Sequence, residues 1–94
     1  MKRMTSITRF DSYLKRVGKN IRDARLKANL TQLDVVEKIG VEYRYYQRME
    51  AGRINMTLMS LYRLAKLFNV EMYALTNGVR LKKKKNRMKF RSIS

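Results

Sequence analysis

Residues 31–52, TQLDVVEKIGVEYRYYQRMEAG, decide the fold of this chain. Apolar residues recur at steps of three and four on either side of Gly40, which is typical of short amphipathic helices. Thr31 is a good N-cap, and Asp34 three residues later completes a shortened capping box. Gly40 and Gly52 can each adopt the left-handed conformation that ends a helix. The stretch therefore predicts two helices joined by a tight turn, the second of which carries tyrosines and arginines.

Three further helices are predicted around this pair. The helix before it is expected to start at Asp11 or Ser12, which are competent N-caps. Its apolar stripe consists of Phe10, Leu14, Val17, Ile21, Ala24 and Ala28. After the pair, Thr57 is the expected cap and Asn69 the expected end of another amphipathic helix. Its stripe consists of Leu58, Leu61, Leu64, Ala65 and Phe68. Residues 70–75 fit a short last helix.

The composition excludes several classes of protein. Cysteine and histidine are absent and the seven carboxylates are scattered, so no metal site and no catalytic constellation is predicted. A glycine-rich phosphate cradle is also missing, and we expect no enzyme, no cofactor and no small-molecule ligand. No apolar run is long enough for a signal peptide or approaches the ~20 residues that span a bilayer. With no proline and little strand-like alternation, the 94 residues are expected to form one all-helical domain, soluble and cytoplasmic.

The charge is strongly positive and unevenly distributed. The net charge is +16, and residues 1–78 hold 15 Lys and Arg against seven acids. Residues 79–94 hold eight Lys and Arg and no acid. Such an excess favours a polyanionic partner, but charge alone does not separate DNA from RNA or an anionic membrane. We divide the chain into a flexible basic arm (1–10), a folded domain (11–78) and a flexible basic tail (79–94).

Several short motifs stand at a fixed mutual spacing. They are IRDAR at 21–25, LTQ at 30–32, IGV at 39–41, MEAG at 49–52 and NMTLMSL at 55–61. Through these motifs residues 17–75 resemble the lambda-repressor-like (Cro-type, xenobiotic-response-element) helix-turn-helix family. The resemblance implies a compact five-helix bundle whose third helix enters the DNA major groove. The chain departs from the family pattern at Val36, Glu42, Tyr46 and Met56, and Glu42 brings a negative charge near the phosphates.

The resemblance also implies which residues contact DNA. The residues expected to read bases are Tyr43, Arg44, Gln47 and Arg48, which fall on the outward side of the third helix. The residues expected to contact phosphates are Thr31, Gln32, Tyr45, Arg53 and Asn55. An arginine can bind guanine O6 and N7 together, and a glutamine can pair with adenine. The alternative is a solvated charged face on the third helix and plain helix capping by Thr31.

Three other roles are assigned within the motif. Tyr46 is expected in the core, and Tyr45 at the edge with its hydroxyl near a phosphate. The alternative for the tyrosines is a stacking platform for single-stranded bases, although such platforms are more often built on sheets. Arg25 and Glu50 are a structural ion pair by resemblance, which argues against a catalytic role for Glu50.

These features predict a sequence-specific regulator of transcription, of the repressor or controller type, that binds double-stranded DNA. We expect a homodimer on a palindromic operator, since one helix-turn-helix buries too little surface for strong specific binding. By analogy, the dimer surface is the last helix with Met72, Leu75 and Val79. Binding to DNA would associate the protein with the nucleoid.

Alternative functions remain open from the sequence. One is an antitoxin that binds DNA for autoregulation and a partner toxin through another surface. Another is a nonspecific nucleic-acid or anionic-membrane binder, although separate caps and ends on each helix favour a folded bundle. The tail lysines either follow DNA without sequence preference or only keep the chain in solution. They are Lys82, Lys83, Lys84 and Lys85.

Overall fold

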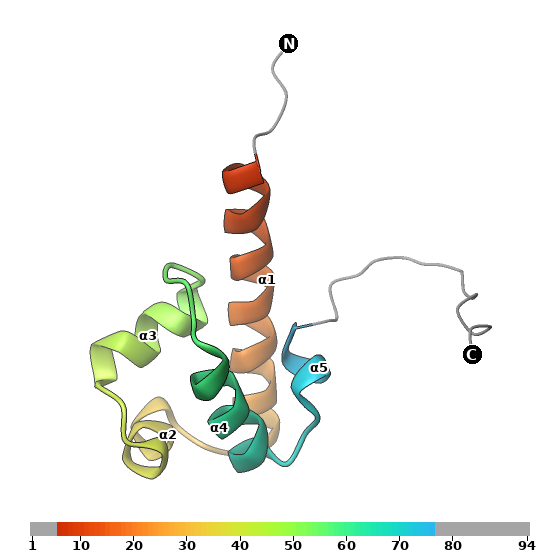
Figure 1. Cartoon of the computed structure of the whole chain (residues 1–94). Coiled ribbons are helices and arrows are strands. Elements are labelled where there is room, and N and C mark those ends of the chain that lie inside the picture. The colour runs from red at the N-terminus through yellow and green to blue at the C-terminus, as the bar shows by residue number, and fades with distance from the viewer. Residues whose placement is uncertain (1–5, 77–94) are drawn as a thin grey trace, which may run out of the picture.

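Five α-helices make up the described part of the chain, residues 6–76, in the computed structural model (Figure 1). They are α1 (Ser6–Lys27), α2 (Gln32–Ile39), α3 (Tyr43–Ala51), α4 (Leu58–Phe68) and α5 (Met72–Thr76). No strand occurs among these residues, so the prediction of an all-helical, five-helix fold is confirmed. The long α1 packs against α3, α4 and α5, and α2 packs against α3 and α4. Figure 1 shows α3 and α5 on opposite sides of α1.

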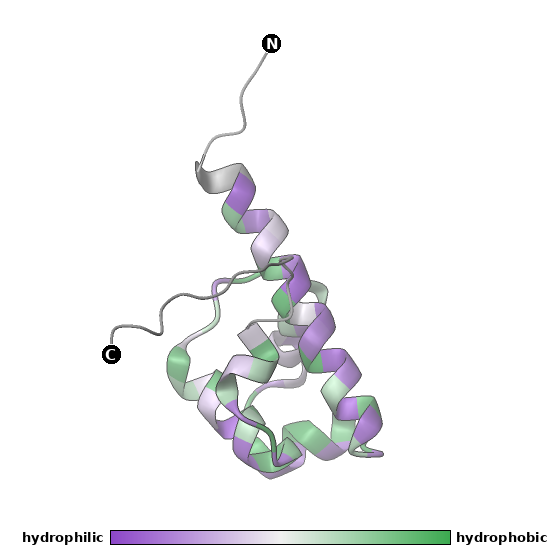
Figure 2. Cartoon of the chain, turned by 90° about the vertical axis from the view of Figure 1, so that its right-hand side faces the viewer, coloured by the Kyte–Doolittle hydropathy of each residue, from purple (hydrophilic) through white to green (hydrophobic). Residues whose placement is uncertain are grey.

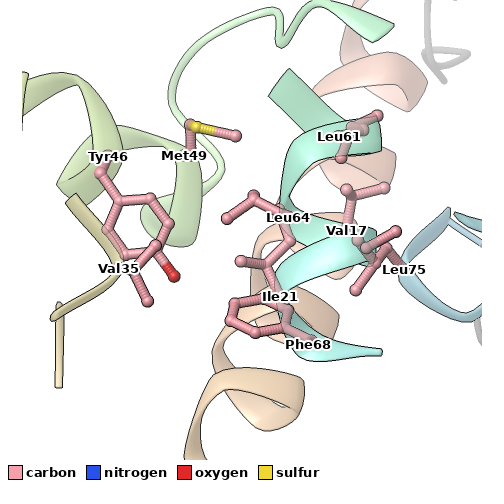
Figure 3. Close-up of a cluster of buried hydrophobic side chains, with 10 residues drawn as sticks. Val17, Ile21, Val35, Tyr46, Met49, Leu61, Leu64, Phe68 and Leu75 are labelled. Carbon is pink, nitrogen blue, oxygen red and sulfur yellow. The ribbon is translucent and has the colours of Figure 1, made fainter. Parts of the chain in front are cut away.

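All five helices contribute to one hydrophobic core (Figure 3). Its fully or almost fully buried members are Val17, Ile21, Val35, Tyr46, Met49, Leu61, Leu64, Ala65, Phe68 and Leu75. Figure 2 shows hydrophobic and hydrophilic residues alternating around the helices, as the three- and four-residue steps in the sequence predict. The core therefore fixes which side of each helix faces solvent.

The predicted helix ends are present where local signals define them. The hydroxyl of Thr31 accepts a hydrogen bond from the backbone N–H of Asp34 at 3.0 Å, and the Asp34 carboxylate accepts one from the N–H of Thr31 at 2.9 Å. This second bond is the main cause of the lowered pKa of Asp34. Gly40 ends α2 at φ +71° and Gly52 ends α3 at φ +68°, both left-handed. Thr57 caps α4, so the boundaries of the central helices follow the sequence.

Two expectations about α1 and α4 are wrong. α1 begins at Ser6, well before Asp11 and Ser12. Neither glycine nor proline interrupts residues 6–10, and each residue added to an existing helix gains a backbone hydrogen bond. Leu58 is 74% exposed and does not belong to the buried stripe of α4. Two successive three-residue steps turn its position about 120° away from Leu64, because an α-helix turns about 100° per residue.

The last helix also differs from the expectation. Leu75 is 1% exposed and packs in the protomer's own core. It therefore offers no surface to a second chain, and its assignment to a dimer surface is wrong. Val79 and the lysines at 82–85 lie outside the described residues, as do residues 1–5.

Candidate nucleic-acid interface

α3 has one buried side and one exposed side. Tyr46 and Met49 are fully buried, which agrees with the core position expected for Tyr46. Together with Val35 of α2, they attach α3 to the rest of the bundle (Figure 3). The opposite side exposes the four residues assigned to base reading, Tyr43, Arg44, Gln47 and Arg48. The structure thus brings these four polar side chains to one solvent-facing side of a short, anchored helix.

The carboxylate of Glu50 is the centre of a hydrogen-bond network beneath that exposed side. Arg25 of α1 donates to it from Nε at 2.6 Å and from Nη2 at 3.2 Å. Gln32 of α2 donates from Nε2 at 3.0 Å, and the hydroxyl of Tyr46 donates as well. Arg25 also donates from Nη1 to the carbonyl of Leu30 at 2.9 Å. The ion pair of Arg25 and Glu50 implied by the resemblance is present and joins α1 to α3. Gln32 connects α2 to the same carboxylate.

The network sets the protonation of its members. Burial acts to raise the pKa of Glu50, but hydrogen bonds from Arg25, Tyr46 and Gln32 outweigh it and lower that pKa. The hydrogen bond to Glu50 raises the pKa of Arg25, and burial followed by the same carboxylate raises the pKa of Tyr46. Glu50 is therefore ionised, Tyr46 neutral and Arg25 charged at neutral pH. The charged pair and its neutral hydrogen-bond partners therefore stabilise the contact between α1, α2 and α3.

Gln32 is held more firmly than the sequence indicates. Its Nε2 donates to Glu50, and its Oε1 accepts a long hydrogen bond of 3.4 Å from the hydroxyl of Tyr43. A glutamine amide nitrogen has two hydrogens, so one donor remains for a phosphate. The side chain thus connects the Glu50 network to the first residue of α3. No local sequence pattern predicts the contact between Gln32 and Glu50, because the two residues are 18 positions apart.

Tyr45 is placed differently from the expectation. The ring is half-buried, and its hydroxyl lies 3.3 Å from Oγ of Ser60 in α4. Ser60 itself is buried, and its Oγ also accepts a hydrogen bond from Oγ1 of Thr57 at 3.0 Å, so the Tyr45 hydroxyl joins a hydrogen-bonded pair at the start of α4. Tyr45 therefore fastens α3 to α4, and its hydroxyl is not directed outward toward a phosphate. The remaining residues assigned to phosphates, Thr31, Arg53 and Asn55, are exposed.

The backbone of α1 touches the last turn of α3. A Cβ atom added to Gly18 would lie 2.5 Å from the carbonyl oxygen of Glu50 and 2.6 Å from that of Met49. A Cβ atom added to Gly52 would lie 2.4 Å from Cα of Lys15. Real Cβ atoms do not approach other atoms so closely, so both positions require glycine. The role of Gly18 was not predicted from the sequence, where a glycine within a helix is its only signal.

The described residues hold neither a cluster of metal-ligating side chains nor a membrane-spanning helix. No group of three or more acidic side chains there is arranged to hold a metal ion. Within residues 6–76, no helix has the length and apolar character to cross a membrane.

Comparison with known proteins agrees with this geometry. Residues 21–75 match the helix-turn-helix family model. The chain belongs to this family, in its lambda-repressor-like form, and by class it is a DNA-binding regulator of transcription. Among solved structures it is similar to the restriction-modification controller protein C.AhdI from Aeromonas hydrophila, with 25% identity and a TM-score of 0.65. The similarity covers 68% of this chain and 97% of C.AhdI. No curated protein matches the sequence.

Proposed function

We propose that the protein binds a two-fold symmetric operator as a homodimer, with α3 of each protomer in the major groove. The exposed side of α3 carries the proposal, since it presents Arg44, Gln47 and Arg48 on a helix whose other side is locked into the core. A helix that is anchored in this way loses little backbone freedom on binding. An arginine and a glutamine can each make two hydrogen bonds to one purine in this groove.

Phosphate contacts on either side of the groove would fix the position of α3. At one end, the first N–H groups of α2 and the free amide hydrogen of Gln32 are available to a phosphate. At the other end, Arg53 and Asn55 are exposed in the connection between α3 and α4. These contacts carry no sequence information themselves but set the register of the base-reading residues. The similarity to a restriction-modification controller supports a regulator of the controller or repressor type.

Replacing both Arg44 and Arg48 by alanine should abolish selection of the operator while the fold is retained, because both side chains are exposed. Each lost bidentate contact removes ~1–3 kcal/mol of discrimination, about 5- to 150-fold. The measurement is sequence selection from a pool of duplexes, with Arg9→Ala/Arg16→Ala, two exposed cations of α1, as the matched control. Unchanged selection by Arg44→Ala/Arg48→Ala contradicts the assignment of α3. A wild-type chain that binds every duplex alike is a nonspecific binder.

The proposed dimer surface lies on the exposed side of α4 and α5. Tyr73 is 67% exposed and Tyr62 is 50% exposed. The half-buried Met72 precedes Tyr73 in the chain and lines one hollow together with Tyr62. Nζ of Lys66 lies 5.9 Å from the centre of the Tyr62 ring, a cation–π contact. Aromatic side chains of this kind are enriched at protein interfaces. Two protomers joined here would read half-sites about one helical turn, ~34 Å, apart.

Replacing Tyr73 by glutamate should convert the dimer to a monomer, because burying an unpaired carboxylate in an apolar contact is costly. Sedimentation equilibrium of wild type and variant measures the change, and operator affinity should fall with it. Leu26→Glu is the matched control, since Leu26 is an exposed apolar residue of α1 (51%) outside the proposed surface. A monomeric wild type, or a variant that stays dimeric, contradicts this surface.

A further inference from the structure

We propose that α1 supplies a second row of DNA phosphate contacts through Lys15 and Arg22. This inference rests on the proposed function, since the phosphates in question flank the half-site that α3 reads. It concerns the edge of α1 that borders α3, defined by Lys15, Gly18, Arg22 and Arg25, and called here the α3 edge. These four residues are separated by steps of three, four and three, which places them on one side of the helix.

The α3 edge lies directly against the helix that is proposed to enter the groove. Gly18 has the carbonyl oxygens of Met49 and Glu50 within contact of its own backbone. Arg25 is ion-paired with Glu50, and the backbone of Lys15 touches Gly52, the C-cap of α3. The two inward members of the edge therefore fasten α1 to α3. The two outward members, Lys15 and Arg22, are exposed at its border.

Lys15 and Arg22 are available for a ligand. Among the described residues, the ion pairs are Lys19 with Asp23 and Arg25 with Glu50, and neither Lys15 nor Arg22 takes part in them. The two residues are two helical turns apart, roughly 10 Å along the axis at 1.5 Å per residue. A cation on a long, flexible side chain at each end of this span suits successive phosphates of one strand better than a single compact anion.

A groove connects Lys15 with residues already assigned to phosphate contact. It has a volume of about 630 Å³ and lies between the amino-terminal half of α1 and the segment after α3. Its polar lining consists of the cations Lys15 and Arg53, the amide of Asn55 and one carboxylate, Asp11, so cations outnumber the acid. Phe10, Leu14 and Ile54 form its apolar walls. Lys15 and the Arg53–Asn55 segment thus face one hollow from opposite sides. Their shared position at the end of α3 favours the phosphodiester backbone as the ligand.

The opposite edge of α1 supplies a matched comparison. Arg9, Tyr13, Arg16 and Asn20 follow steps of four, three and four, and they define the α5 edge. The hydroxyl of Tyr13 donates to the carbonyl of Thr76 at 2.7 Å, and Nδ2 of Asn20 donates to the carbonyl of Leu75 at 2.9 Å. Arg9 and Arg16 are therefore exposed on the α5 side of α1 and, like Lys15 and Arg22, are seven residues apart.

The test is operator binding by the full chain across a range of salt concentrations. Wild type is compared with Lys15→Gln/Arg22→Gln and with Arg9→Gln/Arg16→Gln, which remove the same charge from the same helix. Each lost phosphate contact flattens the slope of log K against log[salt] by about 0.9. Removing two contacts should flatten it by about 1.8, so the affinity ratio between 50 and 200 mM salt falls about 12-fold. The Arg9/Arg16 pair should leave the slope near that of wild type.

Each result decides the inference. A flatter slope for the Lys15/Arg22 variant alone, with the same preferred operator, supports direct phosphate contacts. Equal flattening by both variants shows a general effect of net charge and overturns the inference, as does no flattening by either. Selection of an operator by wild type is scored first, so failure of the proposed function is seen separately. If wild type selects no operator, the inference falls with it.

Discussion

Replacing Glu50 by alanine should remove a large part of the stability of the domain. Arg25 is only 8% exposed, and the substitution removes the Glu50 carboxylate that pairs with its guanidinium. It also removes the hydrogen-bond acceptor of Tyr46 and Gln32. Breaking a buried ion pair by removing one partner costs ~3–5 kcal/mol. Small domains have only ~5–15 kcal/mol in total. Urea unfolding followed by circular dichroism should therefore show a much lower midpoint, or no folded baseline at all.

The Asp23→Ala variant is the control for this prediction. Its partner Lys19 lies 3.1 Å away in an exposed i,i+4 pair, and such pairs contribute only ~0.3–0.5 kcal/mol. The pH dependence is a second check. Because the folded-state pKa of Glu50 is lowered, its contribution is complete above the unfolded-state pKa of ~4.3 and is lost as the pH falls through the folded-state pKa. Equal costs for Glu50→Ala and Asp23→Ala would contradict the structural role of the network.

Gly52→Ala should be far more damaging than Gly40→Ala, although both glycines are left-handed. At Gly40 nothing lies within 4 Å of an added Cβ, so the variant carries only the strain of a positive φ, ~1–2 kcal/mol. At Gly52 the added Cβ would meet Cα and N of Lys15 at 2.4 and 2.7 Å. Backbone cannot rotate away as a flexible side chain does, so α1 and α3 must separate. Overpacking of this kind adds ~1–3 kcal/mol or more.

The difference between the two variants isolates the steric contribution, because the backbone strain is common to both. Chemical unfolding of each variant against wild type gives the two free energies. Gly52→Ala should also weaken operator binding by the molecules that remain folded, since the end of α3 is displaced. Without denaturant, Gly40→Ala should bind the operator as wild type does. Similar losses of stability for both variants would show that α1 and α3 are not in rigid contact.

The sequence predicts best what is decided by neighbouring residues. The capping box of Thr31 and Asp34 and the left-handed Gly40 and Gly52 each depend on a few consecutive positions, and all are present. The ion pair of Arg25 and Glu50 was accessible only through the family resemblance. Its members are 25 residues apart, and no local pattern joins them.

The contacts that the sequence did not predict are tertiary. The bond between Tyr45 and Ser60 and the close approach at Gly18 depend on how whole helices are packed, and helix periodicity does not specify which neighbour a residue meets. Leu75 is another example. Helix periodicity places it on an apolar face but does not specify whether its own protomer or a second copy covers that face. The start of α1 at Ser6 was not predicted, because the extension of an existing helix shows in the sequence only as the absence of glycine and proline.

The position of Glu50 has a consequence for transplanting this motif into another protein. Residues 31–52 contain Gln32, Tyr46 and Glu50, but the arginine that neutralises the carboxylate is in α1. A graft of α2 and α3 alone would carry a buried, uncompensated negative charge. The last turn of α3 would also lose its close contact with α1 at Gly18. The smallest portable unit is therefore α1 through α3 together, so a host scaffold must accept three helices even though two form the recognised motif.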